Sequence, residues 1–269
     1  MMNISRILSL PQKLSMAPKA AQHHKGRNMI AVASGKGGVG KTWLSITLAH
    51  AFAKEGLKTL LFDGDLGLAN VDIQLGLVTP YDLGSVITGR VPLTQAIVPC
   101  EPCGFDVIAG RSGSGSLANI PLSRLQLIFD DLQLLASQYD KVIIDLGAGV
   151  EKAVRLFAGN AGTLVVVCTD EPTSLTDAYA FIKIISRENP DVDIKVVVNS
   201  ANTYREGEKT YATLLKACQG FLKISPALAG IVRRDTRVRD SIRSQTSMLT
   251  SYPNAEATGD VLKIAENLK

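Results

Sequence analysis

The chain has 269 residues, of which 46% are hydrophobic and 20% are charged, and its formal net charge is +4. This length and apolar content suffice to bury one substantial core. So small a charge does not by itself indicate nucleic acid or an anionic membrane as a partner. No apolar run approaches the roughly 18 residues that a membrane-spanning helix needs, and the N-terminus lacks the features of a signal peptide. We therefore expect a cytoplasmic protein.

The composition changes near residue 28. Residues 1–27 carry scattered Lys, Arg, Ser and Pro with one short apolar patch at Ile4, Ile7 and Leu8, which predicts a flexible N-terminal tail. From Asn28 onward, short apolar runs alternate with longer amphipathic segments. This alternation is typical of a parallel sheet wrapped by helices, so residues 28–269 are expected to form one α/β domain.

The expected elements follow one another in βα order. Strands are predicted at 29–33, 59–62, 106–109, 141–144, 162–168, 193–198 and 229–232. Most of them are apolar throughout, as strands covered on both faces must be. Helices are predicted at 42–54, 122–137, 151–158, 175–187, 208–222, 236–244 and 255–268. The last helix has an apolar stripe at Val261, Ile264, Ala265 and Leu268, a spacing suited to packing on the sheet.

A glycine-rich segment between the first predicted strand and helix has P-loop spacing: Gly35-Lys36-Gly37-Gly38-Val39-Gly40-Lys41-Thr42. The glycines let backbone N–H groups turn around a β-phosphate at a helix N-terminus, whose partial positive charge favours the anion. Lys41 then neutralises charge on the β- and γ-phosphates, and the Thr42 hydroxyl is a ligand for Mg²⁺. This motif predicts a P-loop NTPase domain with ATP and Mg²⁺ as its cofactors.

Lys36 is a second lysine, at the start of the loop, where an ordinary P-loop needs no cation. Because Lys41 already serves the loop's own γ-phosphate, Lys36 can act in trans across a dimer, as an arginine finger does. With this lysine, the sequence resembles the MinD/ParA family of dimerising ATPases. The resemblance implies a homodimer in the ATP state, with Lys36 contributing to hydrolysis in the partner; a plain surface lysine is the alternative.

Two carboxylates, Asp63 and Asp65, follow the second predicted strand and can point to the same side of the sheet edge. The resemblance implies that Asp65 positions the attacking water and that Asp63 lies near Mg²⁺. Asp145 ends a strand of Walker B type and is expected to hold Mg²⁺ through water, because Mg²⁺ keeps much of its hydration shell. The alternative for these carboxylates is a helix cap or a solvated turn.

Two later positions are expected on the base side of the nucleotide. The resemblance places Asn199, after the sixth predicted strand, at the adenine edge, although Asn199 is equally suited to a turn. It also places the loop that contains Asp235 beside the same base. The arginines that follow suggest DNA binding, but acidic residues interrupt them, so a solvated helix face is favoured and DNA is not expected as a partner.

Cys100 and Cys103 form an isolated Cys-x-x-Cys in a segment that contains proline. Tetrahedral zinc needs two further ligands that no nearby His or Cys supplies, so we interpret the pair as part of a loop rather than a metal or redox site. Cys168 and Cys218 are expected to be buried.

Within the MinD/ParA family, the sequence resembles the FlhG branch, also called FleN or YlxH, over residues 28–258. Four segments carry this resemblance: 63–72, 109–113 with 117–119, 145–150 and 170–179. Cell-division MinD proteins usually have Ser-Pro-Ala-Gly where this chain has Leu146-Gly147-Ala148-Gly149. The branch implies a regulator of flagellar number or placement. Its implied partners are an FlhF-like GTPase, the flagellar C-ring or a flagellar transcription regulator.

Two departures from this branch concern the termini. Residues 1–27 contain no Asp-Gln-Ala motif of the kind that stimulates FlhF, and the last predicted helix is not cationic enough for a membrane anchor. We therefore expect weak or absent membrane association, with a peripheral position at the inner membrane or cell pole left open.

The alternative functions are ParA-like DNA partitioning and MinD-like regulation of the division site. A ligase of the amidotransferase type is disfavoured, because 269 residues leave little room for a substrate domain.

Overall fold

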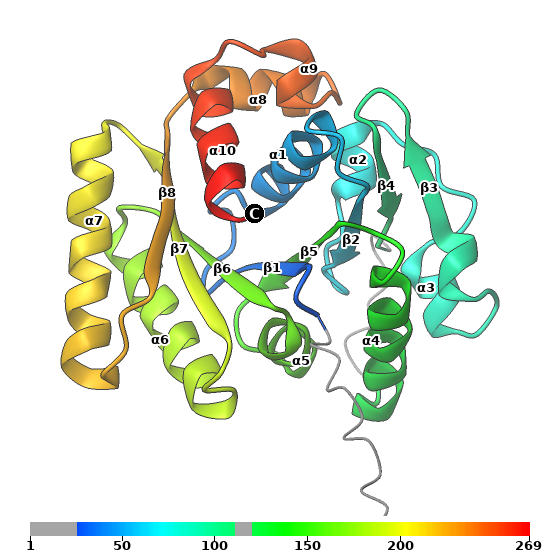
Figure 1. Cartoon of the computed structure of the whole chain (residues 1–269), viewed down its shortest axis with the longest axis horizontal. Coiled ribbons are helices and arrows are strands. Elements are labelled where there is room, and N and C mark those ends of the chain that lie inside the picture. The colour runs from blue at the N-terminus through cyan, green and yellow to red at the C-terminus, as the bar shows by residue number, and fades with distance from the viewer. Residues whose placement is uncertain (1–25, 111–119) are drawn as a thin grey trace, which may run out of the picture.

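The computed structural model describes residues 26–110 and 120–269, so nearly all of the tail predicted at 1–27, and part of one FlhG-like segment, lie outside the described residues. The core is an eight-stranded sheet in the order β3-β4-β2-β5-β1-β6-β7-β8 (Figure 1). Neighbouring strands are parallel except for β3 and β4, which are antiparallel. The strands are β1 (Met29–Ser34), β2 (Thr59–Gly64), β3 (Ile97–Cys100), β4 (Phe105–Ile108), β5 (Lys141–Ala148), β6 (Thr163–Cys168), β7 (Asp193–Ala201) and β8 (Ala227–Arg233).

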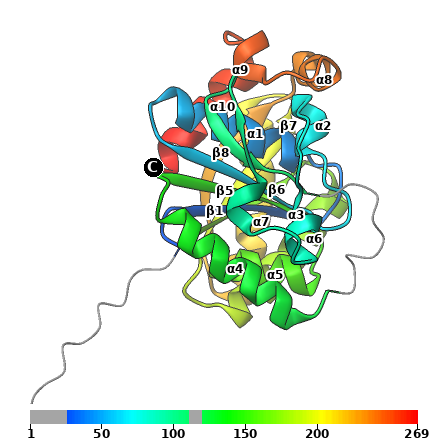
Figure 2. The ribbon, with the colours of Figure 1, turned by 90° about the vertical axis from the view of Figure 1, so that its right-hand side faces the viewer.

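Helices cover both faces of this sheet, as Figures 1 and 2 show. One layer contains α1 (Lys41–Lys54) and α10 (Glu256–Asn267), and the other contains α4 (Leu122–Ala136), α5 (Lys152–Asn160), α6 (Pro172–Glu188) and α7 (Tyr204–Ala217). Strand β1 alternates between the two resulting cores: Met29 and Ala31 pack into one cluster, Ile30 and Val32 into the other. The prediction of a single, mostly parallel α/β domain of P-loop type is confirmed.

The sequence did not predict every element. Strand β3 was missed because Pro99 lies within it; proline cannot donate to a ladder and is confined to edge strands, and β3 is an edge strand. Cys100 therefore ends a strand rather than lying in a loop, and Cys103 lies in the turn that follows. The short helices α2 (Val71–Leu75), α3 (Leu83–Ile87), α8 (Thr236–Arg243) and α9 (Met248–Ser251) complete the fold, with a 3₁₀ turn at Leu93–Ala96. Of these, only α8 was predicted.

Helix α7 begins at Tyr204, one turn earlier than predicted, because Thr203 caps it: its hydroxyl accepts a hydrogen bond from Glu206 N at 3.2 Å. A π-helical turn, Cys218–Leu222, extends its other end. In α10 the predicted stripe is buried against the sheet, with Val261 and Ile264 at most 1% exposed. Among the described residues, we find no helix that is both long and apolar enough to span a bilayer.

Candidate nucleotide-binding site

The P-loop leaves β1 at the carboxyl edge of the sheet and leads directly into α1. Gly38 and Gly40 have φ values of 78° and 91°, a region that side chains rarely tolerate. Among the described residues, no side chain caps the N-terminus of α1, so its first backbone N–H groups are available to an anion. Within the same part of the chain, a Cβ atom added at Gly37 or Gly38 would meet nothing within 4 Å, so the loop is open on this side. These features fit a bound phosphate chain.

The two ends of the loop are held by close packing. A Cβ at Gly35 would lie 2.2 Å from the carbonyl oxygen of Asp177 in α6. A Cβ at Gly40 would lie 2.3 Å from Asn199 Nδ2 at the end of β7. Both positions therefore exclude any larger residue, and α6 and β7 fix the position of the loop.

Lys41 lies where the P-loop assignment requires it. Its side chain is buried, with 8% of the residue exposed, and Nζ donates to Ser34 Oγ at 2.9 Å. Ser34 Oγ in turn donates to the carbonyl oxygen of Lys36 at 2.6 Å. Burial lowers the pKa of Lys41, and the charges of Asp145 and Asp65 oppose that effect. Because its ammonium is desolvated, Lys41 would be stabilised by the negative charge of a bound phosphate.

Asp145 lies in the second half of β5 and is 1% exposed. Its carboxylate accepts a hydrogen bond from Ser45 Oγ at 2.9 Å and is also bonded by the Thr42 side chain. Burial raises the pKa of Asp145 to about 6, although these hydrogen bonds and Lys41 act in the opposite direction. The structure thus brings the predicted Mg²⁺ residues Thr42 and Asp145 together. It adds Ser45, which the motif does not include although it lies three residues after Thr42, a spacing that shares a helix face.

Asp63 is paired with Asp145 across the neighbouring strands β2 and β5 and is fully buried. Its Oδ1 accepts from Asp65 N at 3.2 Å, and its Oδ2 accepts from the N–H groups of Asn70 and Val71 at 3.1 Å. Burial and the charge of Asp145 raise the pKa of Asp63 to about 8. Asp63 therefore organises the loop after β2 and the start of α2, and its place beside Asp145 is compatible with a role near Mg²⁺.

Asp65 is half-buried in the same loop. Its Oδ1 accepts from the N–H groups of Gly67 at 3.1 Å and Leu68 at 2.9 Å. A Cβ at Gly147, near the end of β5, would lie 3.3 Å from this oxygen, so a small residue there makes room for the carboxylate. Within the part of the chain that the structure describes, Asp65 Oδ2 has no hydrogen-bond partner. One oxygen thus orients the side chain while the other is available to a water molecule.

Lys36 lies against the N-terminus of α6 at the protein surface. Its Nζ donates to the carboxylate of Glu171 and, at 2.9 Å, to Thr173 Oγ1, both at the N-terminus of α6. The Lys36 and Glu171 side chains are 36% and 59% exposed, so this is a surface contact. Segment 170–179 carries part of the FlhG resemblance, but a contact of Lys36 with Glu171 or Thr173 was not expected, because a pairing over 135 positions leaves no local signal in the sequence.

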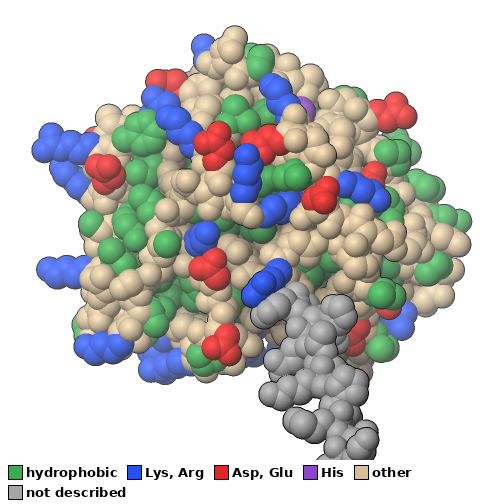
Figure 3. All heavy atoms as spheres, in the orientation of Figure 1, with side chains coloured by type: hydrophobic (Ala, Val, Ile, Leu, Met, Phe, Trp, Pro, Cys, Tyr) green, Lys and Arg blue, Asp and Glu red, His purple; other side chains and the backbone are tan. Residues whose placement is uncertain are grey.

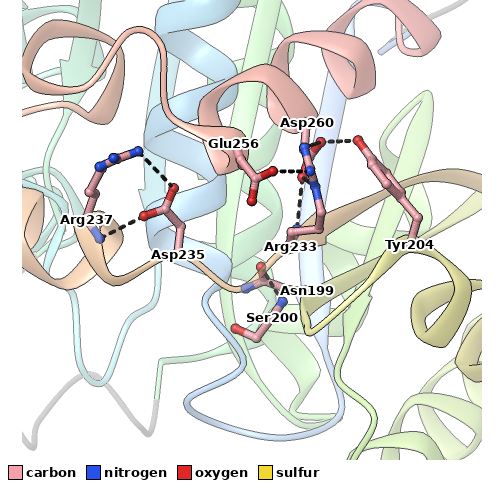
Figure 4. Close-up of polar contacts among 8 residues, drawn as sticks. All are labelled: Asn199, Ser200, Tyr204, Arg233, Asp235, Arg237, Glu256 and Asp260. Atoms are coloured by element: carbon pink, nitrogen blue, oxygen red, sulfur yellow. Dashed lines mark hydrogen bonds and ion pairs between the residues drawn. The ribbon is translucent and has the colours of Figure 1, made fainter.

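The predicted base-side residues lie at the ends of β7 and β8 (Figure 4). Asn199 is 6% exposed; its Nδ2 donates to Val39 O in the P-loop at 2.7 Å and its Oδ1 accepts from Ser200 N at 2.9 Å. Asp235 caps α8 by accepting from Arg237 N at 3.0 Å. Asn199 therefore joins the end of β7 to the phosphate-binding loop, and Asp235 has the capping role that is common for Asp.

The arginines of α8 lie on its surface. The Arg237 side chain is 52% exposed, with Nη1 3.9 Å from the Asp235 carboxylate, and Arg239 and Arg243 are exposed. Over most of the molecular face in Figure 3, basic and acidic side chains are interspersed rather than gathered by sign. This arrangement agrees with the solvated face predicted from the sequence.

The two cysteines of the Cys-x-x-Cys are buried and free, as are Cys168 and Cys218. Within residues 26–110 and 120–269, there is no group of three or more His, Cys, Asp or Glu side chains placed to hold a metal.

Comparison with known proteins agrees with the geometry. Residues 30–248 match the CobQ/CobB/MinD/ParA nucleotide binding domain. The antiactivator FleN of Pseudomonas aeruginosa is 36% identical over 233 residues, which cover 86% of this chain and 82% of FleN. The flagellum site-determining protein YlxH of Helicobacter pylori is 32% identical over 239 residues, covering 88% and 80% of the two chains. The similarity to the FlhG branch that the sequence predicts is confirmed.

Solved structures share the fold. The cell division ATPase MinD of Pyrococcus furiosus has a TM-score of 0.76 at 22% identity, covering 90% of this chain and 98% of that one. MinD of Pyrococcus horikoshii, solved as a complex with Mg-ADP, has a TM-score of 0.76 at 20% identity, covering 90% and 96%. A MinC:MinD complex from Aquifex aeolicus has a TM-score of 0.74 at 25% identity, covering 90% and 95%.

Proposed function

Because the chain belongs to the CobQ/CobB/MinD/ParA family of nucleotide-binding proteins, we propose that it is an ATP-dependent dimerisation switch that regulates flagellar number or placement through protein partners. The chain is an ATPase, as members of the MinD/ParA group are. The open P-loop with the buried Lys41 beside it is the observation that carries the proposal. The ATP-bound state of such a switch has to last long enough for a partner protein to bind it, so hydrolysis is slow.

In this proposal the first turn of α1, the P-loop N–H groups and Lys41 bind the phosphates. Thr42 would hold Mg²⁺, with Asp145 and Asp63 near the ion and its water. The ion would supply positive charge against the phosphates. Asp65 orients the attacking water through its free oxygen, and Asn199 and the loop containing Asp235 flank the base.

Lys36 completes the site of a second copy of the chain. Its place at the outer end of the P-loop and its 36% exposed side chain support a role across a dimer interface. The γ-phosphate is the group that such a lysine reaches, so ATP favours the dimer and ADP the monomer. The complex of MinD with MinC shows that a relative of this fold assembles with a protein partner.

The flagellar assignment is supported by the names of FleN and YlxH, two relatives that match 86% and 88% of this chain. An FlhF-like GTPase, the flagellar C-ring or a flagellar transcription regulator is the corresponding partner. MinD of Bacillus subtilis is 34% identical over 172 residues, which cover only 63% of each chain. This shorter match favours the flagellar branch over a division-site role.

Two experiments test the proposal. Light scattering of the Asp65→Ala protein with ATP is expected to show a dimer, and Lys36→Ala in the same background is expected to show monomers, as ADP does. Deletion of the gene in the native cell is expected to change the number or position of flagella. Unchanged flagella together with ATP-dependent, salt-sensitive retention on DNA would favour a partitioning ATPase instead.

A further inference from the structure

Asp260 is a buried carboxylate that the nucleotide chemistry does not use. It lies in α10 with its side chain 0% exposed, and among the described residues its carboxylate is bonded by two residues on other elements, Arg233 and Tyr204. Its Oδ2 accepts from Arg233 N and Nε, both at 3.0 Å, and its Oδ1 accepts from Arg233 Nη2 at 3.0 Å and from the Tyr204 hydroxyl. Figure 4 shows this group beside Asn199 and Ser200.

The contact with Arg233 involves main chain as well as side chain. Arg233 is the last residue of β8, so Asp260 fixes the backbone where the strand passes into the loop that contains Asp235. On the other side of this point, Arg234 N donates to Ala201 O at 2.8 Å, at the end of β7. The loop is therefore held between α10 and the segment that follows Asn199.

The hydrogen bonds between Asp260 and Arg233 join two oppositely charged groups, and the carboxylate is buried. A buried carboxylate with a bidentate guanidinium partner is among the stronger polar contacts in proteins, and removing one partner leaves an uncompensated charge. Although burial opposes ionisation, the hydrogen bonds from Arg233 and Tyr204 keep the pKa of Asp260 below its usual value. Glu256 also pairs with Arg233, but its side chain is 65% exposed, so that pair contributes little.

We propose that Asp260, acting through Arg233, is a positioning residue for the base subsite and sets the discrimination between adenine and guanine. The inference rests on the proposed placement of the base beside Asn199 and Asp235. Adenine and guanine carry different hydrogen-bonding groups on the edge of the base. A binding site distinguishes the two bases only where its own hydrogen-bonding groups are held in fixed positions. Asp260 supplies that fixation from a helix that does not itself reach the base.

The test compares dissociation constants for ATP and GTP, measured with Mg²⁺ by calorimetry on the whole protein. Asp260→Asn keeps the shape of the side chain but removes its charge, and we expect the ratio of the GTP to the ATP dissociation constant to fall about fivefold or more. Glu256→Gln removes only the exposed partner of Arg233 and is the matched control, with an unchanged ratio. Arg233→Lys, which keeps the charge but loses the bidentate contact, is expected to be intermediate.

The outcomes separate this inference from the function on which it rests. If Asp235→Ala lowers the ratio but folded Asp260→Asn and Arg233→Lys do not, the base subsite stands and the role of Asp260 is wrong. A wild-type ratio near one, unaffected by Asp235→Ala, would overturn both. An equal effect of Glu256→Gln would assign the role to the surface ion pair instead. If Asp260→Asn does not fold, Arg233→Lys decides the question alone.

Discussion

Lys36 donates a hydrogen bond from Nζ to the carboxylate of Glu171 in its own chain. The same lysine is the residue proposed to reach the γ-phosphate of a partner. The two contacts exclude each other, because a single ammonium cannot lie at the N-terminus of α6 and in a second active site. In the proposed dimer, each protomer would therefore break its own ion pair before Lys36 reaches the partner.

The first prediction concerns this ion pair. Glu171→Gln removes the charge that holds Lys36, and we expect the dissociation constant of the ATP-bound dimer to decrease. An exposed pair contributes at most about 1 kcal/mol, and two are broken per dimer, so the decrease is up to roughly 30-fold. Sedimentation velocity in an Asp65→Ala background measures it. Glu188→Gln, which frees Arg155 from a comparably exposed pair, is the control, and equal dimerisation in both variants would contradict the idea.

The second prediction concerns Asp65. Asp65→Asn keeps an oxygen that can accept from Gly67 N and Leu68 N, so the loop is preserved, but it loses the carboxylate proposed to orient water. We expect ATP binding within about threefold of wild type and turnover at least about tenfold slower. Steady-state phosphate release and a separate nucleotide-binding assay measure the two effects. Glu151→Gln, at an exposed position beside the same edge, should change neither; wild-type turnover by Asp65→Asn would refute the assignment.

The third prediction concerns Lys41. Lys41→Ala removes the buried ammonium that bonds Ser34, and we expect ATP affinity to fall by at least about 100-fold because the β- and γ-phosphate charge is left without its cation. Fluorescent-nucleotide titration measures the loss. Lys54→Ala, in the last turn of the same helix, is the control. Affinity within tenfold of wild type would mean that the phosphates do not lie against Lys41.

The parts of the site that could be predicted from the sequence are those that lie close together along the chain or at strand ends. The P-loop is one continuous segment that follows β1, and Asp145 lies in the second half of the parallel strand β5. Both are therefore expected near the carboxyl edge of the sheet, whichever strands are neighbours. The βα alternation likewise identifies seven of the eight strands.

What could not be predicted depends on contacts between distant segments. The Lys36–Glu171 pair and the Arg233–Asp260 pair need knowledge of which helix packs beside which loop. The hydrogen bonds of Asp63 depend on the path of the chain after β2, which returns to place Asn70 and Val71 over its carboxylate. The helix that starts there is five residues long, too short for a periodic pattern to show.

The last prediction concerns His50, which lies outside the nucleotide site. It is 8% exposed, its Nδ1 lies 2.6 Å from Ser247 Oγ, and burial together with Lys54 lowers its pKa from 6.5 to about 4. As the pH falls below 6.5, His50 becomes protonated in the unfolded chain, whereas in the folded chain it stays neutral until about pH 4. The free energy of unfolding therefore decreases as the pH is lowered from 6.5 to 4. The contribution of His50 to that fall is up to about 2 kcal/mol between pH 7 and pH 5.

Gln can bond Ser247 but does not titrate, so His50→Gln should be progressively more stable relative to wild type as the pH is lowered. Urea unfolding of both proteins at pH 7, 6 and 5 measures this difference, in which the other titrating groups cancel; a difference that stays constant with pH would show that His50 is protonated in the folded protein as readily as in the unfolded one.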